Sequence, residues 1–260
     1  MADLEYCANL TLSQVAERTK AYHMEKFNFT EPNVTFHQGY IEDLKQIATA
    51  SVDVVVSNCV VNLSPRKDLV MQEVFRILKE GGEFYFSDVF VDRRLPDEIA
   101  FDTVLHSECL GGALYVRDFV TLAKATGFKD PRVLTTAPIT IQNDDIEAKV
   151  GMAKFTSMTF RLFKIKALDA YCEDYGQTAT YLGSVKSCPS LFMLDDKHSF
   201  EANRPERVCA NTALMLSETR YGAHFKILGD TSVHYGSFEC SETMAAKQYG
   251  SKSTPNDGCC

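Results

Sequence analysis

Three features of other protein classes are missing from this 260-residue sequence. No apolar run approaches the roughly 18 residues that a transmembrane helix requires, so we expect no membrane span. The 27 basic residues are outnumbered by 35 acidic ones, and no basic stripe is present, which argues against nucleic-acid binding. The N-terminus has neither the positive start nor the apolar core of a secretion signal. We therefore expect a cytoplasmic protein of ordinary globular composition, 45% hydrophobic and 24% charged.

The nine cysteines do not follow a disulfide or zinc pattern. Their number is odd and no Cys-x-x-Cys pair is present, so neither a disulfide framework nor a zinc ribbon is predicted. A single cysteine is most often a small buried apolar residue. Cys59 stands out because it lies in a polar turn after a predicted strand, and Cys109 because a glycine pair closely follows it. The adjacent Cys259 and Cys260 could chelate a soft ion or form a reactive, unstructured tail.

The stretch 51–91 has the pattern of a strand, a helix and a second strand. Residues 52–56 form an apolar run rich in β-branched side chains, which predicts a strand buried on both faces. A serine–proline pair at 64–65 is typical of a helix start. A glycine pair at 81–82 is typical of its end, before a second strand at 83–89. The two strands of such a βαβ unit are parallel.

Polar residues follow the first of these strands, at Asn58, Cys59 and Asn62. Open parallel sheets bind ligands beyond the carboxyl ends of their strands, so these three residues are predicted to lie at a functional site.

The remaining segments alternate between helical and strand patterns, which predicts an α/β domain. Helices are expected at 12–27, 96–109 and 118–126, and strands at 33–40, 132–141 and 155–163. Beyond residue 166, shorter patterns predict strands at 171–182, 190–194 and 225–228 and a helix at 207–216. We therefore expect an α/β domain over 1–164, a small C-terminal α+β domain over 165–228, and a flexible tail over 229–260.

Four motifs of the sequence resemble the arsenite methyltransferase family. They are Gly-Tyr-Ile-Glu-Asp-Leu at 39–44, Ser-Asn-Cys-Val-Val-Asn-Leu at 57–63, Gly-Gly-Glu-Phe-Tyr-Phe-Ser-Asp-Val at 81–89 and Glu-Cys-Leu-Gly-Gly-Ala-Leu-Tyr at 108–115. The second and fourth motifs are specific to that family, whereas a strand after Gly-Gly would fit any methyltransferase of this fold. The resemblance is strong over 13–164 and looser to 228.

The resemblance implies a Rossmann-like S-adenosylmethionine methyltransferase sheet and methyl transfer to trivalent arsenic. Arsenic(III) is soft and thiophilic, so thiolates are the ligands expected for it. Cys59 and Cys109 match two of the family's arsenic-binding cysteines, and its other cysteines lie in an N-terminal region with no counterpart here. A thiol reductant, glutathione or thioredoxin, is implied as co-substrate. The expected partner is a small arsenic(III) compound or its thiol conjugate, and the expected state is a monomer.

The resemblance also assigns positions that would contact S-adenosylmethionine. Ile41 and Glu42 match the turn that cradles adenine. The wall near the methionine part is matched by Asn58, Val61, Asn62 and Leu63. The family's acidic residue for the ribose hydroxyls falls at Asn9, an amide that lacks the charge-assisted acceptance of a carboxylate.

The sequence departs from the family in its glycines. Gly39 is the first glycine and no Gly-x-Gly stretch is present, although the family holds the methionine end of the cofactor in a Gly-rich turn. The sequence therefore reads as the family fold truncated at its N-terminus, without the first strand, the first helix and much of the second strand. We expect an unpaired edge on the strand at 52–56 and weakened cofactor affinity.

Two alternative functions remain open on the sequence. One is a methyltransferase for another small molecule, in which Cys59 and Cys109 would only pack. The other is a catalytically impaired thiol protein that binds arsenic(III) through these cysteines without turnover.

Overall fold

The structure is a computed structural model that describes residues 12–239. The chain divides into two compact units after Tyr40. The first contains helix α2 (Leu12–Phe27), as predicted. Residues 33–40 are not a strand, contrary to the prediction, because a strand needs a hydrogen-bonded partner and the described part of this unit contains no other strand. The predicted contact at Asn9 and the cysteine tail lie outside the described residues.

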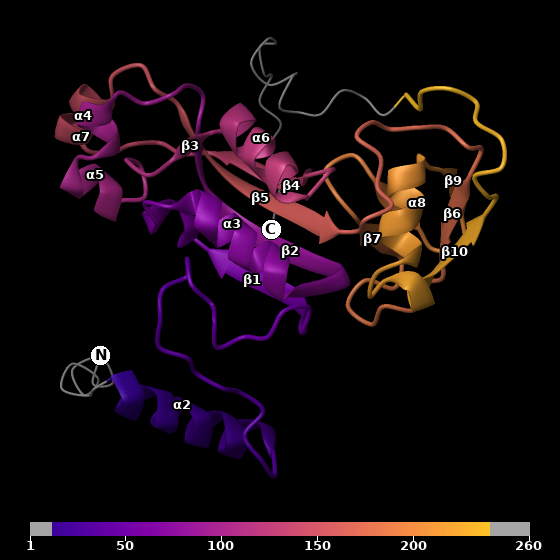
Figure 1. The fold of residues 1–260 in the computed structure, drawn as a ribbon, viewed down its shortest axis with the longest axis horizontal. Coiled ribbons are helices and arrows are strands. Elements are labelled where there is room, and N and C mark those ends of the chain that lie inside the picture. The colour runs from indigo at the N-terminus through magenta and orange to yellow at the C-terminus, as the bar shows by residue number, and fades with distance from the viewer. Residues whose placement is uncertain (1–11, 240–260) are drawn as a thin grey trace. The chain divides into compact units, whose positions relative to one another are not determined.

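The second unit is built on a mixed sheet with the order β1-β2-β5-β4, and β3 also pairs with β2 (Figure 1). Strands β1 and β2 are parallel, as predicted, and β5 runs antiparallel to both β2 and β4. The bounds of its elements, in chain order, are β1 (Val52–Asn58), η1 (Val61–Leu63), α3 (Lys67–Ile77), β2 (Leu78–Val91), α4 (Asp97–Ala100), α5 (Thr103–Ser107), β3 (Leu114–Tyr115), α6 (Val116–Thr126), β4 (Arg132–Pro138), α7 (Asp144–Val150) and β5 (Phe155–Lys164).

The C-terminal elements gather at one end of this sheet (Figure 1). They comprise a three-stranded sheet in the order β10-β6-β9, a β7-β8 hairpin and helix α8. Their bounds are β6 (Thr178–Tyr181), β7 (Leu191–Met193), β8 (Ser199–Glu201), β9 (Pro205–Arg207), α8 (Ala210–Ser217), η2 (Gly222–His224) and β10 (Phe225–Leu228). The predicted α+β appendage is therefore present, with shorter strands than expected.

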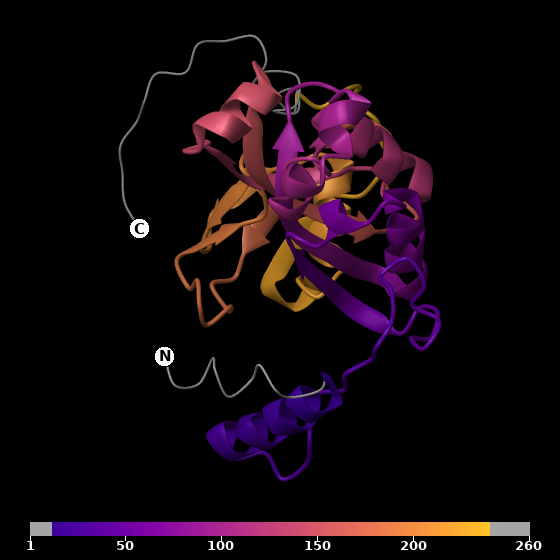
Figure 2. The same cartoon turned by 90° about the vertical axis from the view of Figure 1, so that its left-hand side faces the viewer.

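The alternation of β2 divides its side chains between two layers. Phe84 and Phe86 pack with Val70 of α3 and Phe119 of α6 in the main hydrophobic core. Glu83, of opposite parity, faces the C-terminal elements, where it meets Arg161 of β5. Helix α3 and the C-terminal strands lie on opposite sides of the sheet in the turned view (Figure 2). One face of the sheet therefore packs against α3 and α6, and the other contacts the C-terminal elements.

Strand β1 lies at the edge of the described sheet. It bonds only β2 among the described strands, so the expected unpaired edge is confirmed for residues 41–239. The prediction that β1 is buried on both faces is wrong, because none of its residues is fully buried and Val56 remains 71% exposed. The β-branched run reflects strand propensity here, and the edge position explains the exposure.

The boundary between α3 and β2 differs from the prediction. Helix α3 ends at Ile77, and the glycine pair lies inside β2, where the register against β1 shifts. Gly81 has a φ of +77°, and a Cβ there would lie 2.3 Å from the carbonyl oxygen of Glu218. The glycine therefore serves a close approach of the C-terminal region instead of ending the helix.

The start of one helix and the continuity of another also differ from the prediction. The N-cap of α3 is Arg66, two residues beyond the serine expected to cap it. The single helix expected over 96–109 is two short helices, because Asp102 adopts an extended conformation and accepts hydrogen bonds from the amides of Val104 and Leu105. Helix α7 was not predicted at all, although Asn143 caps it in the same way.

Candidate functional site

The carboxyl end of β1 and the end of α5 bring Cys59 and Cys109 together. The Cys109 Sγ lies 3.8 Å from the carbonyl oxygen of Cys59, although the two residues are 50 positions apart. Cys59 is exposed and Cys109 half-buried. The Cys109 side chain therefore contacts the turn that carries Cys59, at the carboxyl end of β1.

Both cysteines adopt a left-handed backbone conformation. Cys59 has a φ of +52° and Cys109 a φ of +59°, values that disfavour side chains other than glycine. Such strain costs about 1–3 kcal/mol per residue and concentrates at functional sites. Two strained cysteines in contact are therefore a stronger indication of a site than either residue alone.

The strain at Cys109 follows from the way α5 ends. The amide of Cys109 donates to the carbonyl of His106 at 3.0 Å, and the amide of Leu110 donates to the carbonyl of Leu105 at 2.8 Å. These are the two bonds of a Schellman motif, with Cys109 at the position that glycine usually occupies. The turn points Cys109 toward the β1 end while the chain leaves α5.

The turn that carries Cys59 is fixed to β2 by hydrogen bonds. The Cys59 amide donates to the carbonyl of Ser87 at 2.9 Å, and the Asn62 amide donates to Asp88 Oδ2 at 3.1 Å. The Asn62 side chain is buried and donates from Nδ2 to the carbonyl of Val89. Asn62, expected near the methionine part of the cofactor, therefore has its amide engaged with the protein.

The loop after Cys109 packs directly on this turn. A Cβ at Gly112 would lie 2.0 Å from the carbonyl oxygen of Asn62, so only glycine permits this approach. The Gly-Gly pair of the fourth motif therefore brings the two cysteine-bearing turns into contact.

The electrostatics of the site keep both thiols protonated. Burial raises the pKa of the Cys59 thiol above its ordinary 9.0, and the charge of Asp88 raises it further. Burial likewise raises the pKa of Cys109, with smaller contributions from Asp88 and from Cys59 itself. Asp88 thus places negative charge near both thiols and opposes their ionisation.

The residues expected to contact S-adenosylmethionine differ in their exposure. Leu63 is 42% exposed, Asn58 is exposed, and Val61 is buried beneath them. Ile41 is half-buried against the core, and the carboxylate of Glu42 accepts a hydrogen bond from the Ser64 hydroxyl. The Oδ1 atom of Asn58 accepts a contact from Cys59 Sγ at 3.8 Å, so this amide lies against the first cysteine.

Three site residues were missed by sequence reasoning. Asp88 sets the charge near both thiols, Gly112 permits the contact between the turns, and His106 contacts both turns. An aspartate within the apolar strand at 83–89 was the available signal for the first, and the glycine pair after Cys109 for the second. Nothing local to the sequence marks His106. Within residues 12–239, no group of three or more metal-binding side chains converges, and no helix is long and apolar enough to cross a bilayer.

Comparison with known proteins identifies the family. The profile of the family described as "Methyltransferase domain" matches residues 14–137. Arsenite methyltransferase of Aquipseudomonas alcaligenes is 51% identical over 86% of this chain and 65% of its own length. The human arsenite methyltransferase is 43% identical over 82% of this chain and 57% of its own length. The chain thus spans less than two thirds of these curated relatives.

A solved structure agrees with this assignment. The crystal structure of an arsenic(III) S-adenosylmethionine methyltransferase from Chlamydomonas reinhardtii superposes with a TM-score of 0.83 at 44% identity, covering 88% of this chain and 78% of that one. Similarity at this level extends over the sheet and the C-terminal elements together. The chain belongs to the arsenic(III) S-adenosylmethionine methyltransferase family.

Proposed function

We propose that this chain transfers methyl groups from S-adenosylmethionine to trivalent arsenic held by Cys59 and Cys109. The observation that carries the proposal is the contact between two strained, accessible cysteines from separate turns at the carboxyl edge of the sheet. The substrates are arsenite and methylarsenite, or their thiol conjugates, and the biological role is detoxification of arsenic. The chain works as a cytoplasmic monomer.

The first step is ligand exchange at arsenic. Each thiol replaces one hydroxyl of arsenous acid, so an As–S bond forms, an As–O bond breaks, and the thiol proton leaves in the released water. The overall exchange consumes no external base, because each thiol proton leaves with the displaced hydroxyl. Binding to two thiols is entropically favoured over binding to separate ones, because the second sulfur is already in place.

The second requirement is orientation of the arsenic lone pair. When bound, S-adenosylmethionine supplies an electrophilic methyl group on a sulfonium centre. Asn58 and Leu63 would contact its methionine side, and Ile41 and Glu42 its adenine side. The thiolates hold arsenic next to this wall, so the rate enhancement comes from proximity and alignment. Transfer of a methyl group to the arsenic lone pair would raise arsenic formally from the trivalent to the pentavalent state. A thiol reductant, glutathione or thioredoxin, would then supply two electrons and be oxidised to a disulfide, which restores trivalent arsenic.

The proposal is tested with S-adenosylmethionine labelled in its methyl group. Incubation of the full chain with arsenite and glutathione should transfer the label to arsenic, and the Cys59→Ser and Cys109→Ser variants should lose that transfer. Because the described residues supply one wall of the cofactor site, the assay should be run with saturating cofactor. Arsenic binding without label transfer at saturation would contradict the methyltransferase assignment.

A further inference from the structure

His106 contacts both of the cysteine-bearing turns. Its ring Nε2 lies 3.2 Å from the carbonyl oxygen of Leu63, which closes η1 after Cys59. Its own carbonyl accepts the amide of Cys109 at 3.0 Å. One residue therefore bonds to the backbone on both sides of the cysteine pair.

The partner fixes the proton position on the ring. A carbonyl oxygen can only accept, so Nε2 of His106 must carry the hydrogen in this contact. A glutamine in place of His106 could donate the same hydrogen bond, because its terminal amide nitrogen lies at a similar distance from the backbone. Leucine would keep the bulk of the side chain and remove the donor.

Gly112 also takes part in the contact between the two turns. Gly112 lies against the backbone of Asn62 and brings the chains close, but a glycine has no side chain that could oppose a displacement of the Cys109 turn along η1. A hydrogen bond from the ring to Leu63 would resist that motion. His106 borders a cavity of about 300 Å³, together with Lys67, so replacing its ring leaves no enclosed void.

We propose that His106 is a positioning residue that holds Cys109 within chelating distance of Cys59. The inference rests on the proposed function, because it concerns the same two thiols. His106 does not bind arsenic itself. It determines how often the second thiol is in place when the first has reacted.

Phenylarsine oxide is a suitable probe, because it reacts with two thiols to give a bridged dithioarsonite and one water. The measurement is its affinity by calorimetry, in a full chain carrying Cys259→Ser and Cys260→Ser to remove the adjacent pair. His106→Leu should weaken binding about threefold to tenfold, the equivalent of one hydrogen bond. His106→Gln should restore it. Alkylation of Cys109 by iodoacetamide, which needs one thiol only, should be unchanged in both variants.

The outcomes separate the inference from the proposed function. If Cys59→Ser and Cys109→Ser lose phenylarsine oxide binding while His106→Leu binds like the parent, the positioning role is wrong and the dithiol site stands. Weak binding by His106→Gln as well as by His106→Leu would also overturn the role, because the donor would then not matter. If neither cysteine variant loses affinity, the dithiol site and the inference fail together.

Discussion

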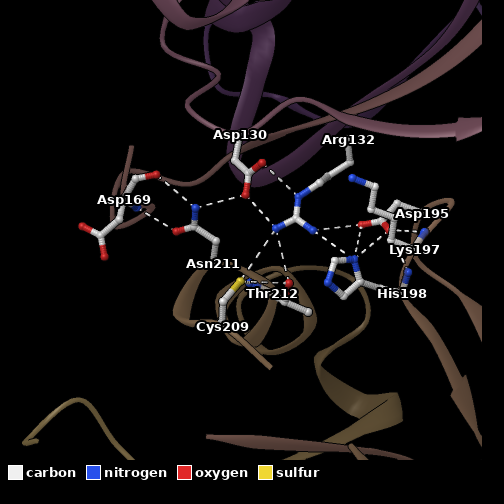
Figure 3. A network of polar contacts seen from close by, with 9 residues as sticks. All are labelled: Asp130, Arg132, Asp169, Asp195, Lys197, His198, Cys209, Asn211 and Thr212. Carbon is white, nitrogen blue, oxygen red and sulfur yellow. Dashed lines mark hydrogen bonds and ion pairs between the residues drawn. The ribbon is translucent and has the colours of Figure 1, made fainter. Parts of the chain in front are cut away.

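The sheet edge that carries the two cysteines and the junction between the sheet and the C-terminal elements are held together by different kinds of interaction. At the edge, Cys59 and Cys109 are strained, accessible and held by backbone hydrogen bonds. At the junction, Arg132 is 6% exposed and carries a charged network between β4 and the C-terminal elements (Figure 3). The molecule thus places these buried charge pairs at the junction, whereas both cysteines of the site are among the five non-glycine residues with a positive φ in the described part of the chain.

The junction network has nearly all of its groups paired. Arg132 donates to Asp130 at 2.7 Å and to Asp195 at 2.9 Å. Asp195 also contacts His198 Nδ1 at 2.7 Å, and Asn211 Nδ2 donates to Asp130 at 3.0 Å (Figure 3). Because each buried charge has a partner, the network fixes how β7, β8 and α8 dock without exposing a reactive group.

A second buried pair supports the same junction. Glu83 of β2 accepts from Arg161 Nε at 2.6 Å and from Arg220 at 2.8 Å. The comparison teaches that paired buried charges join the C-terminal elements to the sheet, whereas hydrogen bonds to the backbone hold the thiol edge and leave its two thiols accessible.

The largest expected effect comes from breaking the junction at its centre. Arg132→Met leaves Asp130 and Asp195 buried without their cation, so the free energy of unfolding should fall by about 3–5 kcal/mol. Urea denaturation of the full chain measures this change. The matched control is Arg204→Met, which breaks exposed pairs with Glu201 and Glu206 and should leave the free energy of unfolding nearly unchanged. Equal losses in the two variants would contradict the distinction drawn here.

The second effect is a dependence of stability on acid pH. Burial alone would raise the pKa of Asp195, but the hydrogen bond from His198 and the charge of Arg132 outweigh it and lower the pKa from 3.8 to about 2. A lowered carboxyl pKa stabilises the fold above the unfolded value, and this contribution is lost as pH falls from about 4 to about 2. The loss should approach about 2 kcal/mol. Denaturation at stepped pH should show the decline, and Asp195→Asn should flatten it.

The smallest effect concerns strain at the thiol edge. Cys109→Gly relieves the left-handed backbone and should raise the free energy of unfolding by up to about 1 kcal/mol, while removing one arsenic ligand. Cys109→Ser keeps the backbone strain, so it should lose the ligand without the gain. A glycine variant no more stable than the serine variant would show that the turn is not strained.

The βαβ unit and the polar turn at Cys59 could be predicted because they follow from short-range patterns. The apolar run at 52–56, the helical spacing of Val70 and Val74, and the polar turn at Cys59 each carry local information. The strand-end rule then predicts a functional site at Asn58, Cys59 and Asn62. The family motifs added Cys109, which local patterns alone left open.

The errors arose where distant residues decide the local structure. Gly81 reads as a helix end, but the carbonyl of Glu218 determines its role. Arg132 and Asp195 are 63 positions apart, and no periodicity links them. The link from His106 to Leu63 spans 43 positions and is likewise invisible to local patterns. Composition and spacing predict elements, and contacts between elements need the fold.

The central claim is that Cys59 and Cys109 bind one arsenic atom together. The most direct measurement is mass spectrometry of peptides from the full chain, with Cys259 and Cys260 changed to serine, after reaction with one equivalent of phenylarsine oxide. We predict one bridged species that joins the peptide containing Cys59 to the peptide containing Cys109. Arsenic bridging any other pair of cysteines, or attached to separate single cysteines, would contradict the account.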